Sequence, residues 1–372
     1  MADAPRGLRV VVAAPARGGV GALARGVVPA LRADGVTVDT VRLPPGGVPA
    51  ALAARSIVRH RRALRRADVV QVDFGRLDAA AFWFAACAAM MRRKVVVVAH
   101  DVPRPINAPA AGLVGHGGRW REVVGHRLLS PLLDRPISRA LWRAVAAVGT
   151  FSHAAARGWD AVPAERIVLI EHGADPPTPG ALPPSAGRHV LFAGFLGPSK
   201  GLDVLLDAWG RLADPPLSLV IAGEPATARD APWVEDLRRR SAAMPVPPEW
   251  LGAVDDAAFA RAFARAAIVV LPYRTSNPAS GILIRALCEG RAVVVTRTAA
   301  ADHLAGGRDP AALVVEPGDP DALAAALRLL LGDPDLRDRL GARAARIGAE
   351  RFTWHNHVRS LRRAYACAGA PA

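Results

Sequence analysis

The sequence is poor in lysine and cysteine. Of its 48 basic residues, only Lys94 and Lys200 are lysines; the others are arginines. The three cysteines, Cys87, Cys288 and Cys367, lie far apart in alanine- and leucine-rich stretches. They form no CxxC pattern or His/Cys cluster of the kind that holds a metal or a redox centre. We therefore expect small buried thiols in a reducing compartment, and no bound metal.

Long apolar runs are also missing. The longest uncharged apolar run, 79–91, has 13 residues, whereas a membrane-spanning helix needs about 20. The apolar run 10–14 is shorter than the core of a signal peptide. We therefore expect a cytoplasmic protein without a membrane span, which leaves peripheral contact with the inner face of the membrane open.

The length and the hydrophobic pattern predict two α/β domains. A chain of 372 residues has room for two domains. Short β-rich runs alternate with helix-length stretches, which predicts doubly wound parallel sheets covered on both faces. The expected strands are 8–14, 37–42, 69–73 and 95–100, then 189–193, 217–222, 268–271, 292–296 and 313–315. The expected helices are 20–33, 50–66 and 79–91, a helix after the N-cap candidate Asp319, and a last helix over 354–366.

A proline-rich stretch separates the two arrays. Five prolines between 175 and 187 cannot continue a helix or an inner strand. We expect a first domain over 1–175, a linker over 176–187 and a second domain over 188–352. Parallel sheets bind ligands outside the carboxyl ends of their strands, so the residues that follow each strand are the candidates for a site.

A glycine-rich turn follows the first strand and opens a helix. The backbone amides at Gly18 and Gly19 are suited to holding a phosphate. Alternatively, residues 19–24 match G-x-G-x-x-A, and Asp39 follows 20 residues after Gly19 at the end of the second strand. That outlines a dinucleotide fingerprint, although four residues separate the strand from its first glycine. A purely structural turn is the third alternative.

Three further candidates follow strands. His100 and Asp101 end an apolar strand, where a histidine can share a proton; the alternative is a hydrogen-bonded structural histidine. Lys200 lies at a helix start, which favours phosphate binding over a solvated surface lysine because lysine is so scarce in this chain. Ser280 and Gly281 open another helix, whose free amides form a second anion-binding candidate.

The order of these segments resembles the GT-B glycosyltransferases of the retaining family 4 type (glycosyl transferases group 1). The segments FAGFLGPSKGLDVLLDAW, SGILIRALCEGRAVVVT and VVEPGDPDALAAAL carry the resemblance, which covers essentially the whole chain. It implies a GT-B fold, in which two Rossmann-like domains face a cleft. It also implies an acceptor-binding N-terminal domain, a C-terminal domain that binds a UDP- or GDP-sugar, and a last helix, 353–372, that crosses back to the first domain.

The resemblance assigns roles to particular residues. It implies a retaining sugar transfer with no bound cofactor or metal. The catalytic residues would be His100, Lys200 and Asn277, and the acceptor side would include His100 and Asp101. The donor-binding residues would be Gly18, Gly19, Gly194, Lys200, Arg274, Ser280, Gly281, Ile282 and Arg285.

Three positions depart from the family's pattern. Phe195 stands where an arginine is usual, and Asn277 and Arg285 stand where two glutamates are usual. Asparagine still hydrogen-bonds a sugar hydroxyl, but arginine cannot accept a bond from a ribose hydroxyl. Arg274 is a candidate for the phosphate charge that Phe195 lacks. A non-catalytic GT-B homologue that binds a nucleotide sugar or a partner is therefore the second hypothesis, and a nucleotide-cofactor oxidoreductase is the third.

The positive charge is uneven. Residues 1–180 carry +12 of the net +15. Arg55, Arg59, Arg62 and Arg66 recur every three or four residues and so share one helix face. Such a helix suits an anionic membrane surface, the alternative being a solvated face. Nucleic acid is not expected, because no recognised binding module is present. The acceptor is left open between a glycan, a glycolipid and a small molecule.

Overall fold

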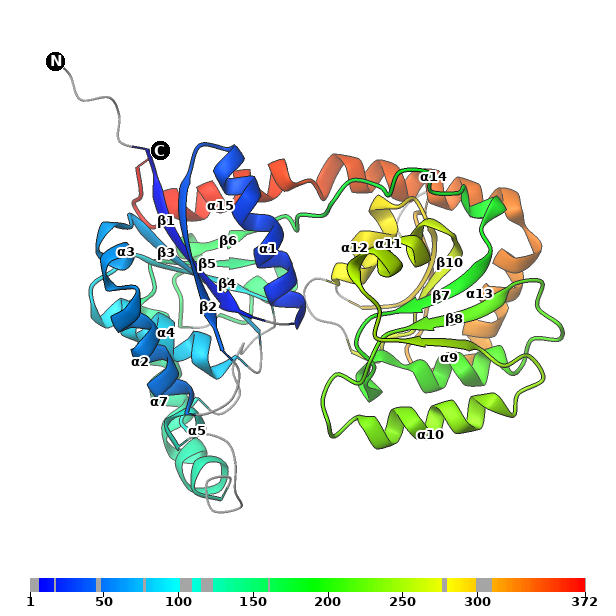
Figure 1. Ribbon diagram of the computed structural model, residues 1–372, viewed down its shortest axis with the longest axis horizontal. Coiled ribbons are helices and arrows are strands. Elements are labelled where there is room, and N and C mark those ends of the chain that lie inside the picture. The colour runs from blue at the N-terminus through cyan, green and yellow to red at the C-terminus, as the bar shows by residue number, and fades with distance from the viewer. Residues whose placement is uncertain are drawn as a thin grey trace. The chain divides into compact units, whose positions relative to one another are not determined.

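The computed structural model describes residues 7–16, 18–44, 48–75, 78–100, 109–114, 123–159, 161–275, 280–298 and 310–371. The chain forms two compact units, one of Met1–Gly173 with Trp354–Ala372 and the other of Ala174–Thr353. Each unit holds a six-stranded sheet whose neighbouring strands all pair in parallel (Figure 1). The protein therefore has the α/β architecture that the sequence predicts.

The first unit has the strand order β2-β1-β3-β4-β5-β6. Its strands are β1 (Arg9–Pro15), β2 (Thr37–Leu43), β3 (Val69–Phe74), β4 (Val95–Ala99), β5 (Ala147–Thr150) and β6 (Ile167–Leu169). Its helices are α1 (Gly18–Ala33), α2 (Pro49–Arg59), α3 (Arg61–Arg66), α4 (Ala79–Met90), α5 (Ala111–Val114), the π-helical η1 (Val123–Leu129), α7 (Ser130–Ala144), α8 (His153–Ala156), the 3-10 turn η2 (Ala164–Arg166) and α15 (Trp354–Cys367).

Helices cover both faces of this sheet. Val27 of α1 and Leu361 of α15 pack on one face, against Val10 and Val98. Helices α2, α3, α4 and α7 pack on the other face, where Phe82 is fully buried. This two-sided burial explains why the inner strands are runs of valine rather than alternating patterns.

The second unit has the strand order β12-β11-β10-β7-β8-β9. Its strands are β7 (His189–Ala193), β8 (Ser218–Ala222), β9 (Glu249–Gly252), β10 (Ala266–Leu271), β11 (Ala292–Thr296) and β12 (Leu313–Val315). Its helices are the 3-10 turns η3 (Pro184–Ala186) and η4 (Pro198–Lys200), α9 (Leu202–Trp209), α10 (Ala231–Ala242), α11 (Asp256–Ala264), α12 (Gly281–Cys288), α13 (Pro320–Gly332) and α14 (Pro334–Arg351).

The second sheet is also covered on both sides. Leu205 of α9 and Leu327 of α13 lie in one core cluster, and Phe263 of α11 and Leu287 of α12 lie in the other. The Asp319 side chain accepts hydrogen bonds from the amides of Asp321 and Ala322, so it is the N-cap of α13 as expected.

Several local expectations need correction. The helix expected over 50–66 is interrupted at His60, which separates α2 from α3. Strands β5, β6 and β9 and helices α7, α10, α11 and α14 were not anticipated. Buried thiols were expected, but Cys367 is exposed and Cys87 is half-buried; only Cys288 is buried. The terminal turn of α15 leaves Cys367 at the surface, where its thiol donates to the Glu165 carbonyl.

The proline-rich stretch is packed on the second unit. The amide of Ser185 donates to Asp338 of α14 at 2.8 Å, and the carbonyl of Leu182 accepts from Arg291 at 2.7 Å. These two backbone groups are thus bonded within the second unit, to which the stretch belongs.

Candidate functional site

The ends of β7 and β10 gather most of the predicted donor residues of the second unit. These strands are neighbours, and β8 lies on the other side of β7, so the strand order reverses here. Such switch points are where open parallel sheets bind ligands. Gly194 and Lys200 follow β7, and Arg274, Ser280 and Gly281 follow β10.

Lys200 is held over the β10 loop by a turn that only glycine allows. It ends η4, and the next residue, Gly201, has a φ of 66°. A Cβ on Gly201 would lie 1.9 Å from the carbonyl oxygen of Pro272, so the two loops meet backbone to backbone. The Lys200 Nζ lies 3.9 Å from the centre of the Tyr273 ring, which places its charge over the loop that leads to α12.

Arg274 ties the two loops together. Its guanidinium binds both carboxylate oxygens of Asp203, at 2.7 and 2.6 Å, and donates to the Pro198 carbonyl at 3.0 Å. Its amide donates to the Ser199 carbonyl at 2.9 Å. Burial favours the neutral acid, but the hydrogen bond and charge of Arg274 hold the pKa of Asp203 below its usual value. Arg274 was expected to offer a phosphate charge; here that charge is paired with Asp203, and the side chain positions the loop of Lys200.

The start of α12 lies against the same loops. The Ser280 hydroxyl caps the helix by accepting from the Leu283 amide at 3.2 Å. Ser280 also bonds the hydroxyl of Tyr273, whose pKa burial raises to about 12. A Cβ added to Gly194, which has a φ of 115°, would meet Ile282 at 3.3 Å. The start of α12 therefore lies beside Gly194 through Ile282. It also lies beside Lys200, because Tyr273 contacts both Ser280 and Lys200.

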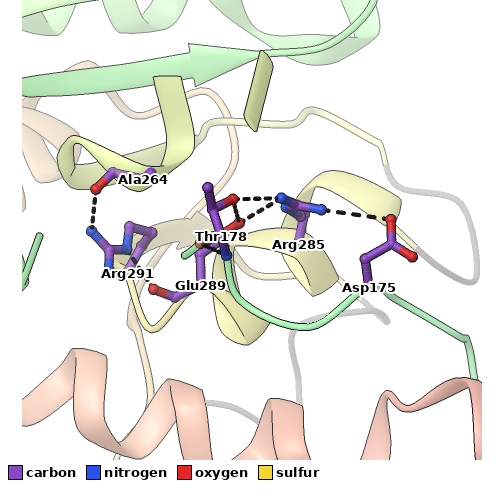
Figure 2. A network of polar contacts seen from close by, with 6 residues as sticks. All are labelled: Asp175, Thr178, Ala264, Arg285, Glu289 and Arg291. Carbon is purple, nitrogen blue, oxygen red and sulfur yellow. Dashed lines mark hydrogen bonds and ion pairs between the residues drawn. The ribbon is translucent and has the colours of Figure 1, made fainter. Parts of the chain in front are cut away.

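Arg285 belongs to a buried polar network that Figure 2 shows. Its Nη2 atom donates to Glu289 at 2.6 Å and to the Thr178 hydroxyl at 2.9 Å, and its Nη1 atom lies 3.9 Å from Asp175. The Glu289 side chain has no exposed area. Its carboxylate also accepts from the amide and the hydroxyl of Thr178, at 3.0 and 2.6 Å. Arg285 thus neutralises a buried carboxylate, and its contact with a donor stays a prediction.

Arg291 extends this network into the core. It is 3% exposed. It donates to the carbonyls of Leu182, Ala266 and Glu289 at 2.7, 3.1 and 2.7 Å, and Figure 2 shows it also approaching Ala264. Sequence reasoning missed Glu289, Thr178 and Arg291, because nothing in a linear pattern marks a glutamate or an arginine as buried.

In the first unit, His100 follows β4 directly. Its ring lies 5.0 Å from that of Phe151, which in turn lies 5.5 Å from His172. Burial, together with the nearby His172 and His357, lowers the pKa of His100 to about 3. The imidazole is therefore neutral at pH 7. Its Nε2 atom is buried and has no hydrogen-bond partner among the described residues. Asp101 lies outside the described residues.

His172 and His357 are two further buried histidines that the sequence did not single out. Their Nδ1 atoms hydrogen-bond the carbonyls of Gly173 and Glu171, at 2.7 and 2.6 Å, and burial lowers the pKa of each to about 4. A histidine with a lowered pKa excludes a proton that the unfolded chain takes up below about pH 6.5. The first unit is therefore destabilised as the pH falls from that value.

The glycine-rich turn has a structural part and an open part. Gly21 must be a glycine, because a Cβ there would lie 2.5 Å from the Pro15 carbonyl oxygen. Gly18 and Gly19, at the start of α1, are exposed. Asp39 was expected to end the second strand; this is wrong, since β2 continues to Leu43 and Asp39 is an exposed residue within that edge strand. The dinucleotide fingerprint thus loses its acidic partner.

The remaining predictions concern Phe195, Asn277 and metals. The Phe195 side chain is 44% exposed, and Asn277 lies outside the described residues. Within the described ranges, no group of three or more His, Cys, Asp or Glu side chains is placed to hold a metal ion. A search of the described helices also found none with the length and apolar character needed to cross a membrane.

The chain is also similar in sequence to known proteins. Residues 187–333 match the family model of the glycosyl transferases group 1. The GDP-mannose:glycolipid 4-beta-D-mannosyltransferase of Xanthomonas campestris is 31% identical over 212 residues, which are 56% of this chain and 54% of that protein. The phosphatidyl-myo-inositol mannosyltransferase of Mycolicibacterium smegmatis is 31% identical over 213 residues, 56% of this chain and 53% of that one. The chain thus spans about half the length of these curated relatives.

Solved structures match nearly the whole chain. The sucrose-phosphate synthase of Thermosynechococcus elongatus superposes with a TM-score of 0.74 at 17% identity, over 98% of this chain and all of that one. The Anabaena protein HepE in complex with UDP and glucose superposes with a TM-score of 0.70 at 16% identity, over 97% of this chain and all of that one. The protein therefore has the GT-B fold of these structures. In sequence, its residues 187–333 are similar to the glycosyl transferases group 1.

Proposed function

We propose that this chain transfers a sugar from a nucleotide-diphosphate sugar to a hydroxyl of a lipid-linked acceptor, with retention of configuration. The observation that carries the proposal is the meeting of the β7 and β10 loops, where Lys200 lies over Tyr273 beside the capped start of α12. A lysine and free helix amides at one strand edge suit a diphosphate. Two relatives are named for mannosyl transfer to a glycolipid and to phosphatidyl-myo-inositol, which supports a lipid-linked acceptor.

The chemistry asks the protein for charge stabilisation and positioning. As the bond from the sugar to the diphosphate breaks, negative charge grows on the leaving group. Lys200 and the amides at the start of α12 would stabilise it. His100 would lie on the acceptor side as a neutral imidazole whose Nε2 atom, without a partner among the described residues, would accept a hydrogen bond from a hydroxyl.

Donor hydrolysis and nucleotide binding test this proposal. Purified protein is incubated with GDP-mannose, UDP-glucose and ADP-glucose, and a thermal-shift screen with the matching nucleoside diphosphates identifies the base. The anomeric signal of the product in NMR spectra decides between retention and inversion. The name of one relative specifies transfer from GDP-mannose with a 4-beta linkage. Formation of a beta linkage from an alpha-linked donor is inversion, so the NMR result separates the proposed retention from that outcome. Release of no sugar from any of the three donors would count against the proposal.

A non-catalytic homologue is the second candidate function. Its support is Arg285. The family's pattern has a glutamate at the position of Arg285, and here the arginine is paired with Glu289. Such a protein would bind a nucleoside diphosphate with the same loops but release no sugar from any donor. Binding without hydrolysis in the same two assays therefore distinguishes it.

Peripheral membrane contact through the basic helices is part of the proposal. Arg55, Arg59, Arg62 and Arg66 are all exposed on α2 and α3. Because α2 and α3 meet at His60, the four form a surface shared by two short helices rather than one continuous stripe. Each arginine near an anionic surface adds about 1 kcal/mol of attraction. Replacing all four by Gln should release the protein from anionic vesicles in flotation while leaving nucleotide binding intact.

A further inference from the structure

The end of the first unit around α5, η1 and α7 exposes large apolar side chains. Leu113, Leu128, Leu132 and Leu133 are 43%, 57%, 75% and 37% exposed. Helix α5 packs against both η1 and α2, and α7 continues directly from η1. We call these four residues the leucine patch. Single exposed leucines need no explanation, but several on adjoining elements mark a binding surface.

Helix α7 is divided into a packed half and an unpacked half. Ile137, Leu141 and Trp142, in its second half, pack on the core of the unit. Leu132 and Leu133 lie in its first half, where most side chains are exposed. Figure 1 shows this part of the helix extending away from the sheet below α4. Nothing in the described core of the unit requires leucines at these positions.

The surroundings of the leucine patch are basic. Arg127, Arg135, Arg139 and Arg143 are exposed, and none of them forms an ion pair with another described residue. Leu132, Arg135, Arg139 and Arg143 follow at three- and four-residue spacing, so they lie on one face of α7. The acidic residue of α7, Asp134, is occupied in accepting from the amide of Ala110 at 2.9 Å.

We infer that the leucine patch inserts into the headgroup region of an anionic lipid bilayer. The inference deepens the proposed function, because it rests on a lipid-linked acceptor. Apolar side chains with arginines beside them match the boundary between acyl chains and anionic headgroups. The arginines around the patch favour an anionic membrane as the partner. A second copy of this chain would present an equally basic patch and would be repelled. Unlike the α2–α3 arginines, the leucines contribute binding that salt does not screen.

Flotation with vesicles of equal parts phosphatidylglycerol and phosphatidylcholine tests the inference. Leu132→Ser should weaken vesicle binding about tenfold, because it removes one leucine from the bilayer, and Leu128→Ser/Leu132→Ser should weaken it further. Leu329→Ser is the matched control: Leu329 is 51% exposed on α13 of the second unit, and its loss should change nothing. Wild type should keep part of its binding at high salt, whereas Leu128→Ser/Leu132→Ser should not.

A spectroscopic label reports insertion directly. An environment-sensitive dye is attached to Leu132→Cys or, as control, to Leu329→Cys, each in a Cys367→Ala background because Cys367 is exposed. Anionic vesicles should shift the emission to the blue at 132 only. Flotation without a shift at 132, no flotation at all, or a dimer that Leu132→Ser dissociates would each overturn the inference. Donor hydrolysis, measured without lipid, tests the proposed function separately. Its absence from the wild type would count against that function, whereas the inference requires equal hydrolysis in the wild type and in all these variants.

Discussion

Removing the Glu289 carboxylate tests whether the Arg285 network stabilises the second unit. The Glu289 side chain is fully buried and accepts three short hydrogen bonds, from Arg285 at 2.6 Å, from the Thr178 hydroxyl at 2.6 Å and from the Thr178 amide at 3.0 Å. Glu289→Ala leaves the half-buried guanidinium with only the exposed Asp175, 3.9 Å away, as a counter-charge, and it orphans the Thr178 amide. Breaking one side of a buried pair costs about 3–5 kcal/mol.

The chain offers a matched control at its surface. Glu316 pairs with Arg297 at the same N–O distance, 2.6 Å, but the two side chains are 63% and 55% exposed. An exposed pair contributes at most about 1 kcal/mol, so Glu316→Ala should barely change stability. The comparison therefore sets a buried carboxylate with two further hydrogen bonds from Thr178 against an exposed carboxylate with the same ion-pair distance.

Native-state hydrogen exchange is the suitable assay, because two units need not unfold in one step. The amides of β10 and β11 report the opening of the second unit. Glu289→Ala should lower their opening free energy by several kcal/mol. Arg285→Met/Glu289→Met should recover part of that loss, since an apolar pair replaces a buried ion pair at little cost while the Thr178 amide stays unpaired. Equal effects of Glu289→Ala and Glu316→Ala would refute the reasoning. Nucleotide affinity of the double variant then shows whether Arg285 also contacts a donor.

Three other perturbations have definite expected results. Lys200→Ala should cost about 1.5–3 kcal/mol of nucleoside-diphosphate affinity by calorimetry, the size of a charge-assisted hydrogen bond, whereas Lys94→Ala, at the only other lysine, should cost nothing; equal affinities would end the donor-site assignment. His100→Ala should lower turnover about 100-fold with little change in nucleotide affinity, and a parallel fall of both would make His100 a structural residue. Acid should destabilise the first unit from about pH 6.5 downward, because three histidines with lowered pKa values resist protonation in the folded state. Burial raises the pKa of Asp73 to about 7, although its hydrogen bond from Gln71 lowers it. Asp73 therefore takes up one proton in the folded state and stabilises the unit in acid, but the three histidines outweigh it. If hydrogen exchange of the β4 amides does not accelerate between pH 6.5 and 4.5, this prediction is wrong.

The sequence predicted the fold best where burial on both faces leaves a continuous apolar run. Strands 189–193 and 292–296 were predicted at the residues where β7 and β11 lie, and these strands are almost entirely buried. Strands of three or four residues carry little pattern that distinguishes a strand from a loop. Of the four such strands, β5, β6 and β9 were missed and β12, at 313–315, was predicted. The break at His60 was missed for a related reason: the arginine spacing continues across it.

The candidate site was predictable in position but not in its charge partners. Strand ends and helix starts can be found in a sequence, and they located Gly194, Lys200 and Ser280 at one sheet edge. The partners of Arg274 and Arg285 could not be found in this way. Asp203 is 71 residues from Arg274, and only the tertiary fold brings the two together.

The ion pairs of Arg274 with Asp203 and of Arg285 with Glu289 change which groups are available to bind a donor. Two arginines were predicted to bind it, but Arg274 is neutralised by Asp203 and Arg285 by Glu289. A diphosphate at the β7–β10 edge would therefore be stabilised chiefly by Lys200 and by the amides at the start of α12. The two arginines would act indirectly, Arg274 by fixing the loop that presents Lys200 and Arg285 by anchoring α12 to Thr178. Loss of Arg274 should then weaken nucleotide binding only insofar as it displaces Lys200, so Lys200→Ala and Arg274→Ala together should be little worse than Lys200→Ala alone.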